Sequence, residues 1–89
     1  MLSTLGPEGM ATLKTHPARL REVNSEVEAM GCQVVAQWAL LGDYDFATVL
    51  EAPDDKAVAR VAVALGARGT LKTRTLSAIP IDEFIDLLG

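Results

Sequence analysis

Two strand-like runs flank a glycine turn in the middle of this chain, and the turn sets the register between them. Residues 32–41 and 46–52 are rich in Val, Ala and Leu, and Gly42-Asp43 lies between the two runs. Glycine adopts the positive φ that the first position of a two-residue hairpin turn requires. The sequence therefore predicts an antiparallel hairpin with two distinct faces. One face is expected to hold the pairs Leu41–Tyr44, Ala39–Phe46, Gln37–Thr48 and Val35–Leu50.

The cost of burying charge decides which face meets the helices. The second face carries Asp45 and Glu51, and burying two carboxylates is far more costly than burying one Thr and one amide that can each find a partner. We therefore expect the first face to pack against helices through Phe46, Leu50, Leu41 and Tyr44. The second face, called the helix-free face below, is expected to present Val34, Ala36, Trp38, Leu40, Ala47 and Val49.

Helical periodicity alternates with strand-like runs along the rest of the chain. The expected order is a strand at 1–5, helices at about 8–14 and 17–30, strands at 32–41 and 46–52, a helix at about 56–65, a strand at 71–78 and a short helix opened by Pro80 and Asp82. This is the βαββαβ order of a ferredoxin-like α+β sandwich with a C-terminal helix. We expect a single domain over residues 1–89.

Local signals place the ends of the two longer helices. Pro17 suits a first helical position, with Thr15 or His16 as the cap, and Gly31 suits the residue that follows a helix. Asp54 or Asp55 is expected to cap the next helix, which Gly66 is expected to stop. The C-terminal helix is expected to be apolar along Phe84, Ile85, Leu87 and Leu88.

Size and composition indicate self-association. A chain of 89 residues with 49% hydrophobic residues has little interior in which to bury them, because small domains cover only about 60–68% of their unfolded surface. We expect at least a homodimer in which the helix-free face is covered. A net charge of −4 argues against nucleic acid as a partner. No long apolar run predicts a membrane segment, and a lone Cys32 cannot form an intrachain disulfide. We expect a cytoplasmic protein.

Several motifs together resemble those of the GYD domain family, which is named for a Gly-Asp/Glu-Tyr-Asp signature. They are Thr15–Arg19, Leu41–Asp45, Glu51–Asp55, Leu65–Gly69 and Thr73–Leu76. The resemblance implies a ferredoxin-like fold of the dimeric α+β barrel type and brings no catalytic residues. The chain is also similar, more distantly, to the effector-binding domains of leucine-responsive-type regulators. Those domains bind small molecules at subunit interfaces, and this chain lacks their helix-turn-helix half.

The helix-free face is the candidate site. Trp38 offers a large ring with one hydrogen-bond donor, and Asp45 and Glu51 share its face. We expect these three residues to bind a small amphipathic or cationic molecule where they meet a second subunit, together with Tyr44 and Arg74. Lys72 is an alternative counter-charge to Arg74 on the same strand.

Residues that could carry chemistry are few. His16 is the only histidine and Cys32 the only cysteine, and they have no metal-ligand spacing. We therefore expect no metal and no cofactor, and a non-catalytic module that binds a ligand or serves assembly. Two alternatives stay open. One is a dimeric-barrel enzyme of the oxygenase or isomerase type, in which His16 or Tyr44 reaches an interior cavity. The other is a purely structural assembly protein.

Overall fold

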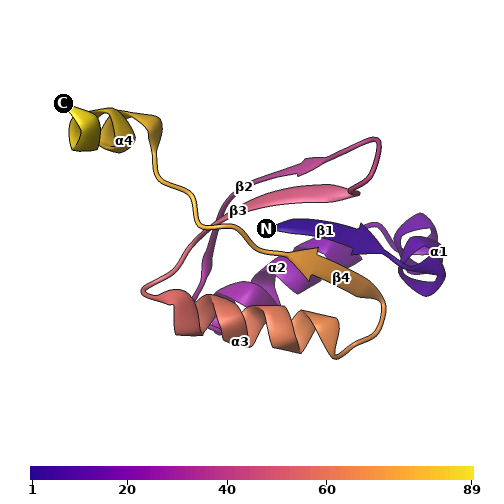
Figure 1. Cartoon of the computed structure of the whole chain (residues 1–89). Coiled ribbons are helices and arrows are strands. Elements are labelled where there is room, and N and C mark those ends of the chain that lie inside the picture. Colours follow the sequence, from indigo (N-terminus) through magenta and orange to yellow (C-terminus); the bar gives the residue numbers. More distant parts are fainter.

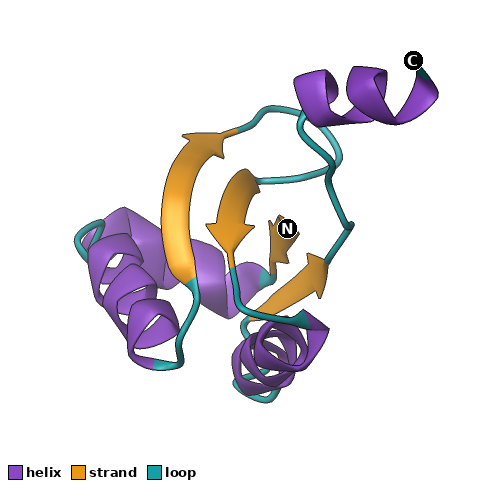
Figure 2. Ribbon diagram, turned by 90° about the vertical axis from the view of Figure 1, so that its left-hand side faces the viewer, coloured by secondary structure: helices purple, strands orange, loops and turns teal.

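The computed structural model describes residues 1–89, and its strands form one antiparallel sheet in the order β2-β3-β1-β4 (Figure 1). Helices α2 and α3 cover one face of this sheet, and no helix lies on the other (Figure 2). The predicted ferredoxin-like α+β fold is confirmed. The elements are β1 (Leu2–Leu5), α1 (Pro7–Thr15), α2 (Arg19–Ala29), β2 (Gln33–Ala39), β3 (Phe46–Glu51), α3 (Asp55–Gly66), β4 (Leu71–Arg74) and α4 (Ile81–Leu88).

Helix α2 begins later than predicted and ends as predicted. Its first residue is Arg19, and Pro17 lies in the preceding turn. No side chain caps its N-terminus, so the predicted cap from Thr15 or His16 is wrong.

The C-terminus of α2 is closed by glycine in the left-handed region. Gly31 has a φ of 95°, and its N–H donates to the carbonyl oxygen of Glu28 at 3.0 Å. The N–H of Cys32 donates to the carbonyl oxygen of Val27 at 3.4 Å. These two bonds form a Schellman motif, which satisfies the last carbonyls of the helix and turns the chain into β2.

Helix α3 carries the predicted acidic cap. A carboxylate oxygen of Asp54 accepts a hydrogen bond from the N–H of Ala57 at 2.9 Å, which satisfies a donor that the first turn leaves free. The predicted stop is wrong in detail, because Gly66 is still helical and Gly69, with a φ of 73°, turns the chain instead.

The hairpin loop is wider than a two-residue turn. Gly42 has a φ of 117°, which confirms the need for glycine there. The last backbone hydrogen bond between the strands joins the N–H of Leu40 to the carbonyl oxygen of Asp45 at 2.8 Å, and four residues remain in the loop. Leu41 is fully exposed and Tyr44 is half-buried. The prediction that both pack against the helices is wrong, because the wide loop carries them away from the covered face.

A β-bulge corrects the predicted register at the far end of the hairpin. The structure confirms the pairing of Gln37 with Thr48, but it pairs Leu50 with Val34, because the strand is irregular at Val35. The extra residue of a bulge exchanges the faces of the residues beyond it. Val34 therefore packs against the core, and its predicted place on the helix-free face is wrong.

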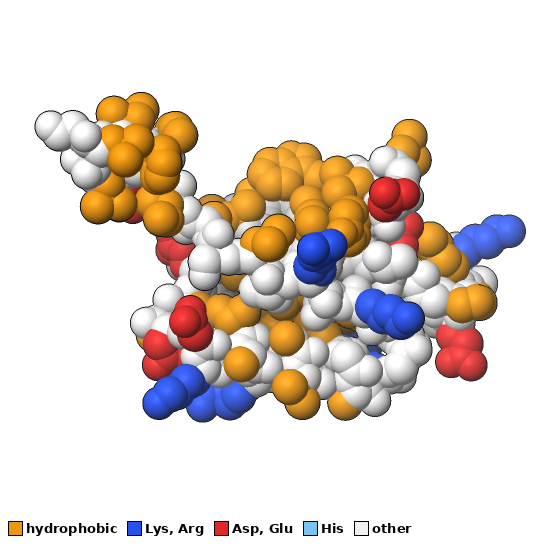
Figure 3. Space-filling view, viewed as in Figure 1, with side chains coloured by type: hydrophobic (Ala, Val, Ile, Leu, Met, Phe, Trp, Pro, Cys, Tyr) orange, Lys and Arg blue, Asp and Glu red, His pale blue; other side chains and the backbone are white.

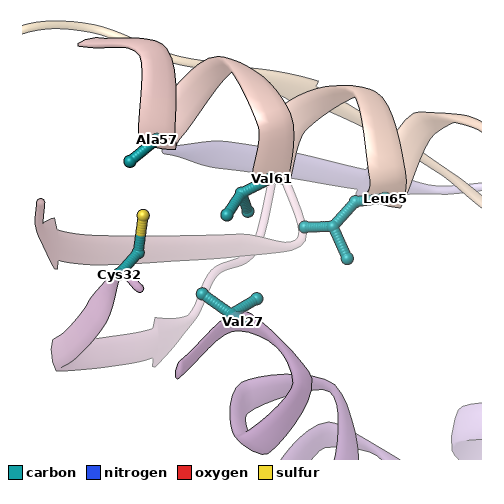
Figure 4. Packing of buried hydrophobic residues seen from close by; sticks show 5 residues of the cluster. All are labelled: Val27, Cys32, Ala57, Val61 and Leu65. Atoms are coloured by element: carbon teal, nitrogen blue, oxygen red, sulfur yellow. The ribbon is translucent and has the colours of Figure 1, made fainter. Parts of the chain in front are cut away.

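The core is small and lies between α2, α3 and the sheet. Only 7 of 89 residues are buried, so this domain has little interior to stabilise it. Three small or medium side chains of α3 face two residues from α2 and the start of β2 (Figure 4). The cluster consists of Val27, Cys32, Ala57, Val61 and Leu65.

The C-terminal part of the chain leaves the body of the domain. Strand β4 ends at Arg74, four residues earlier than predicted, because its pairing with β1 is complete at Leu2. Residues 75–80 contain no helix or strand, and the predicted C-terminal helix α4 stands clear of the sheet (Figures 1 and 2). The radius of gyration is 14.2 Å, against about 12 Å for a compact chain of this length. No helix has the length and apolarity needed to cross a membrane.

The close approach of α1 to the segment before β4 can be tested with two glycines. A Cβ at Gly9 would lie 2.7 Å from the carbonyl oxygen of Thr70 and 3.1 Å from Cδ2 of Leu5. We expect Gly9→Ala to lower the free energy of unfolding by about 1–3 kcal/mol, as overpacking does. The control is Gly66→Ala, where a helical Cβ meets nothing within 4 Å, and it should stabilise by about 0.5–1 kcal/mol.

Urea denaturation of the two variants measures both effects. Equal or opposite shifts would contradict the packing of α1 described above.

Candidate functional site

One row of side chains crosses the whole helix-free face. The register pairs Trp38 with Ala47, Ala47 with Leu2, and Leu2 with Arg74. At about 4.8 Å between neighbouring strands, the row extends over about 14 Å. It has an aromatic ring on the β2 edge, apolar side chains in the middle and a guanidinium on the β4 edge.

Hydrophobic side chains gather around this row. Figure 3 shows them over β2 and β3, with basic side chains beside them. Trp38 is 56% exposed and Val49 is 45% exposed. Leu2 was not predicted to belong to this patch, because the register of a four-residue strand cannot be read from its sequence. Five of the six predicted interface residues share this face by register: Ala36, Trp38, Leu40, Ala47 and Val49.

The structure brings two of the predicted ligand-binding residues into contact. Nη1 of Arg74 donates a hydrogen bond to the hydroxyl oxygen of Tyr44 at 3.1 Å. Because β1 lies between β3 and β4, this bond spans the central strand. Lys72 lies two residues before Arg74 on β4, so both side chains are on the same face of the sheet. Together they give this face a basic edge.

The two predicted acidic residues are used differently. The Asp45 carboxylate accepts a hydrogen bond from the N–H of Leu5 at 2.7 Å, and the Asp45 N–H donates to the carbonyl oxygen of Ser3 at 2.8 Å. Asp45 therefore provides hydrogen-bond partners for backbone groups of β1. Glu51 lies six residues further along β3, about 20 Å away at ordinary strand rise. The five predicted residues do not converge on one point.

A chain of polar contacts and ion pairs runs beside α2. His16 and Arg19 lie 3.2 and 3.1 Å from the carboxylate of Glu22, and Arg19 lies 3.3 Å from that of Glu26. Arg68, which follows α3, also pairs with Glu26. Hydrogen bonds lower the pKa of both carboxyl groups, mainly from His16 for Glu22 and from Arg68 for Glu26. The chain of pairs ties α2 to the end of α3.

The remaining reactive groups form no catalytic arrangement. The thiol of Cys32 is buried in the core, out of reach of a substrate. His16 is exposed and belongs to the ion-pair chain. No group of three or more His, Cys, Asp or Glu residues lies close enough together to hold a metal ion.

A cavity of about 340 Å³ lies on the helix-covered side of the sheet. Its walls are mostly apolar and come from α1, α2, the end of α3 and all four strands. On one wall, Asn24 donates to the Gln37 side-chain carbonyl at 2.7 Å, and Gln37 donates to the Thr48 hydroxyl at 3.0 Å. The lining also includes Arg19 and Arg68, whose guanidinium groups are both paired with Glu26. Sequence periodicity cannot reveal a cavity that depends on how far two helices stand apart.

The pairing of Arg68 with Glu26 predicts a pH dependence. The pKa of Glu26 is lowered from its ordinary value of 4.5 in the folded protein, so its ionised form stabilises the fold above about pH 4.5. This stabilisation is lost as the pH falls through the folded pKa. We expect Glu26→Gln to flatten the decline of the free energy of unfolding between about pH 5 and pH 3. The effect should be small, because both side chains are partly solvated.

Denaturation at a series of pH values measures this decline. Glu28→Gln is the control, since Glu28 lies on the same helix and forms no ion pair. A decline as steep in Glu26→Gln as in Glu28→Gln would contradict the role assigned to the pair.

Comparison with known proteins identifies the family. The GYD domain matches residues 1–88. A protein of Thermus thermophilus, described as a glutamine synthetase and cystathionine beta-lyase binding protein, is 50% identical over 86 residues. The match covers 96% of this chain and 90% of that relative. No solved structure matches. The chain belongs to the GYD domain family.

Proposed function

We propose that this protein is a small non-catalytic module that assembles with a second copy through its helix-free face and binds metabolic enzymes. The observation that carries the proposal is the apolar row on that face. A monomer would hold Trp38 and Val49 in water while burying only 7 of 89 residues. Exposed apolar patches of this size on small proteins generally mark interaction surfaces.

The energetics favour covering the face from both sides. Four strands of ordinary length present about 350 Å² per face. At about 25 cal/mol per Å², covering the faces of two copies contributes up to about 18 kcal/mol. Association costs roughly 4–15 kcal/mol. Covering the face with a second copy is therefore favourable at this upper estimate of burial.

The relative supports protein partners for the assembled module. Its name states that it binds glutamine synthetase and cystathionine beta-lyase. Half of the residues are identical over nearly the full length of both chains, so the similarity extends over the whole domain. We extend this binding of the two enzymes to the present chain.

Two placements favour a non-catalytic role over a dimeric-barrel enzyme. Such an enzyme needs a titratable group that faces a cavity. His16 is paired with Glu22 in solvent, and the Tyr44 hydroxyl is bonded to Arg74. Neither His16 nor Tyr44 lines the cavity on the helix-covered side.

The same geometry disfavours a small-molecule site built from all five predicted residues. Only Tyr44 and Arg74 contact each other, and the Asp45 carboxylate already has a partner in β1. A purely structural assembly protein is the second candidate. It differs from the proposed module in having no enzyme partner.

Assembly and enzyme binding can be measured on the same samples. Light scattering of the native protein should give at least twice the chain mass of 9.5 kDa. Val49→Lys should give a monomer, because it places a charge in the covered face. The matched control is Val63→Lys, since Val63 is more exposed, at 71%, and lies on α3. It should keep the native mass.

Binding to immobilised glutamine synthetase and cystathionine beta-lyase of Thermus thermophilus is measured next, with the Thermus relative as the positive control. We expect the native protein and Val63→Lys to bind both enzymes. A folded native monomer at high concentration would refute the assembly. An assembled protein that binds neither enzyme would leave the purely structural candidate.

A further inference from the structure

Helix α4 has an apolar stripe and stands apart from every other helix and strand of its chain (Figures 1 and 2). Its large side chains recur at three- and four-residue spacing, as on a helix that packs against another surface. They are 43–76% exposed. An isolated helix of eight residues is not stable in water, so α4 depends on packing that its own domain does not supply. The stripe consists of Ile81, Phe84, Ile85 and Leu88, with Leu87 beside it.

The segment before α4 holds it away from the body. Residues 75–80 pair with no strand, and this segment also exposes apolar side chains at Leu76 and Ile79. Pro80 precedes the helix with a fixed φ, which stiffens the joint. Figures 1 and 2 show α4 at a distance from every other helix and strand. The arm, defined as residues 75–89, is therefore presented for contact with another molecule.

The helix-free face matches α4 in size. A helix of 8 residues is about 12 Å long, and the row across the sheet is about 14 Å long. Both surfaces are apolar in the middle. Figure 3 shows hydrophobic side chains on α4 and over the sheet as two separate groups on one molecule.

The two surfaces also match in charge. Helix α4 carries three acidic residues and no basic one, at Asp82, Glu83 and Asp86. The β4 edge of the helix-free face carries Lys72 and Arg74. When the apolar stripe lies on the sheet, the acidic residues lie at the border of the contact and face the basic β4 edge. This match of charge favours one orientation of α4 on the face over the others.

We propose that α4 of each chain packs on the helix-free face of a second copy, so that two chains exchange their C-terminal arms. This inference rests on the proposed function, because it names the element that covers the face. A helix of 8 residues is about 12 Å long and about 10 Å wide, so it covers about 120 Å² of the sheet. The reciprocal exchange forms this contact twice in one dimer. A two-fold dimer closes this exchange and leaves no arm free.

Cross-linking between differently substituted chains tests the exchange. One chain carries Ala47→Cys at the centre of the face and a tag that increases its size, and the other carries Ile85→Cys at the centre of the α4 stripe. The native Cys32 is 1% exposed and is shielded from reagent, and the unsubstituted protein is the control for this. The two chains are mixed, allowed to exchange and treated with a short bismaleimide.

We expect the main product to be the mixed dimer of one tagged and one untagged chain. A product formed only between two tagged chains would mean direct sheet-to-sheet contact. That outcome overturns the arm exchange and leaves the proposed assembly intact. A chain that carries both substitutions is also tested. If its two cysteines are cross-linked only within a single chain, α4 folds back on its own sheet, which overturns both proposals. A monomer without any cross-link would also overturn both.

A second variant keeps the test independent of cysteine chemistry. Phe84→Asp places a charge in the apolar stripe and should convert the assembly to a monomer by light scattering. The control is Asp86→Asn, on the acidic side of α4, which should keep the mass. An unchanged mass in Phe84→Asp would contradict the exchange without contradicting assembly through Val49.

Discussion

A sheet covered by helices on one face only is the constraint from which the other features of this protein follow. The covered face supports a core in which five residues form the buried cluster, and a core of that size contributes little stability. The uncovered face presents Trp38, Ala47, Leu2 and Arg74 in a row across all four strands. We propose that a domain with so little interior and so much exposed apolar surface is stabilised by association. Its function is therefore inseparable from what covers that face.

The arrangement of charge agrees with a binding role. Arg19, Glu22, Glu26 and Arg68 pair with one another beside α2, and Asp45 is bonded to the end of β1. None of these groups is left unpaired in a cavity, where catalysis requires it. Among the charges that form no ion pair are the basic edge at Lys72 and Arg74 and the acidic side of α4. These two are complementary and lie on one chain, which is the basis for an assembly closed by its own arms.

The sequence predicts this fold well where a residue acts through its own backbone. Gly31 and Gly42 both adopt positive φ, and Asp54 caps α3, because each effect depends on a few neighbouring residues. The order of elements follows from periodicity, and the family resemblance rests on motifs of the same local kind. The burial argument also holds, since Gln37 and Thr48 lie on the covered face and bond to each other.

Features that depend on distant contacts are not predictable in the same way. The bulge at Val35 turns Val34 toward the core, and no local signal marks it. The wide hairpin loop leaves Leu41 exposed. The loop is wide because β3 is paired with β1 and does not extend to the turn. The predicted ligand-binding site and the observed row on the helix-free face differ because both depend on contacts between distant parts of the sequence. The row across the face requires the register of β1 against both neighbours, and the position of α4 requires the whole chain.

The fluorescence of Trp38 tests the central claim most directly, because it is the only tryptophan and lies on the face in question. Its emission and its quenching by acrylamide are measured from micromolar to nanomolar concentration, beside Val49→Lys at each step. If a second copy covers the face, the native protein shows blue-shifted, protected emission at high concentration, and Val49→Lys shows red-shifted, readily quenched emission throughout. Red-shifted and equally quenched emission from both proteins at every concentration would contradict the account.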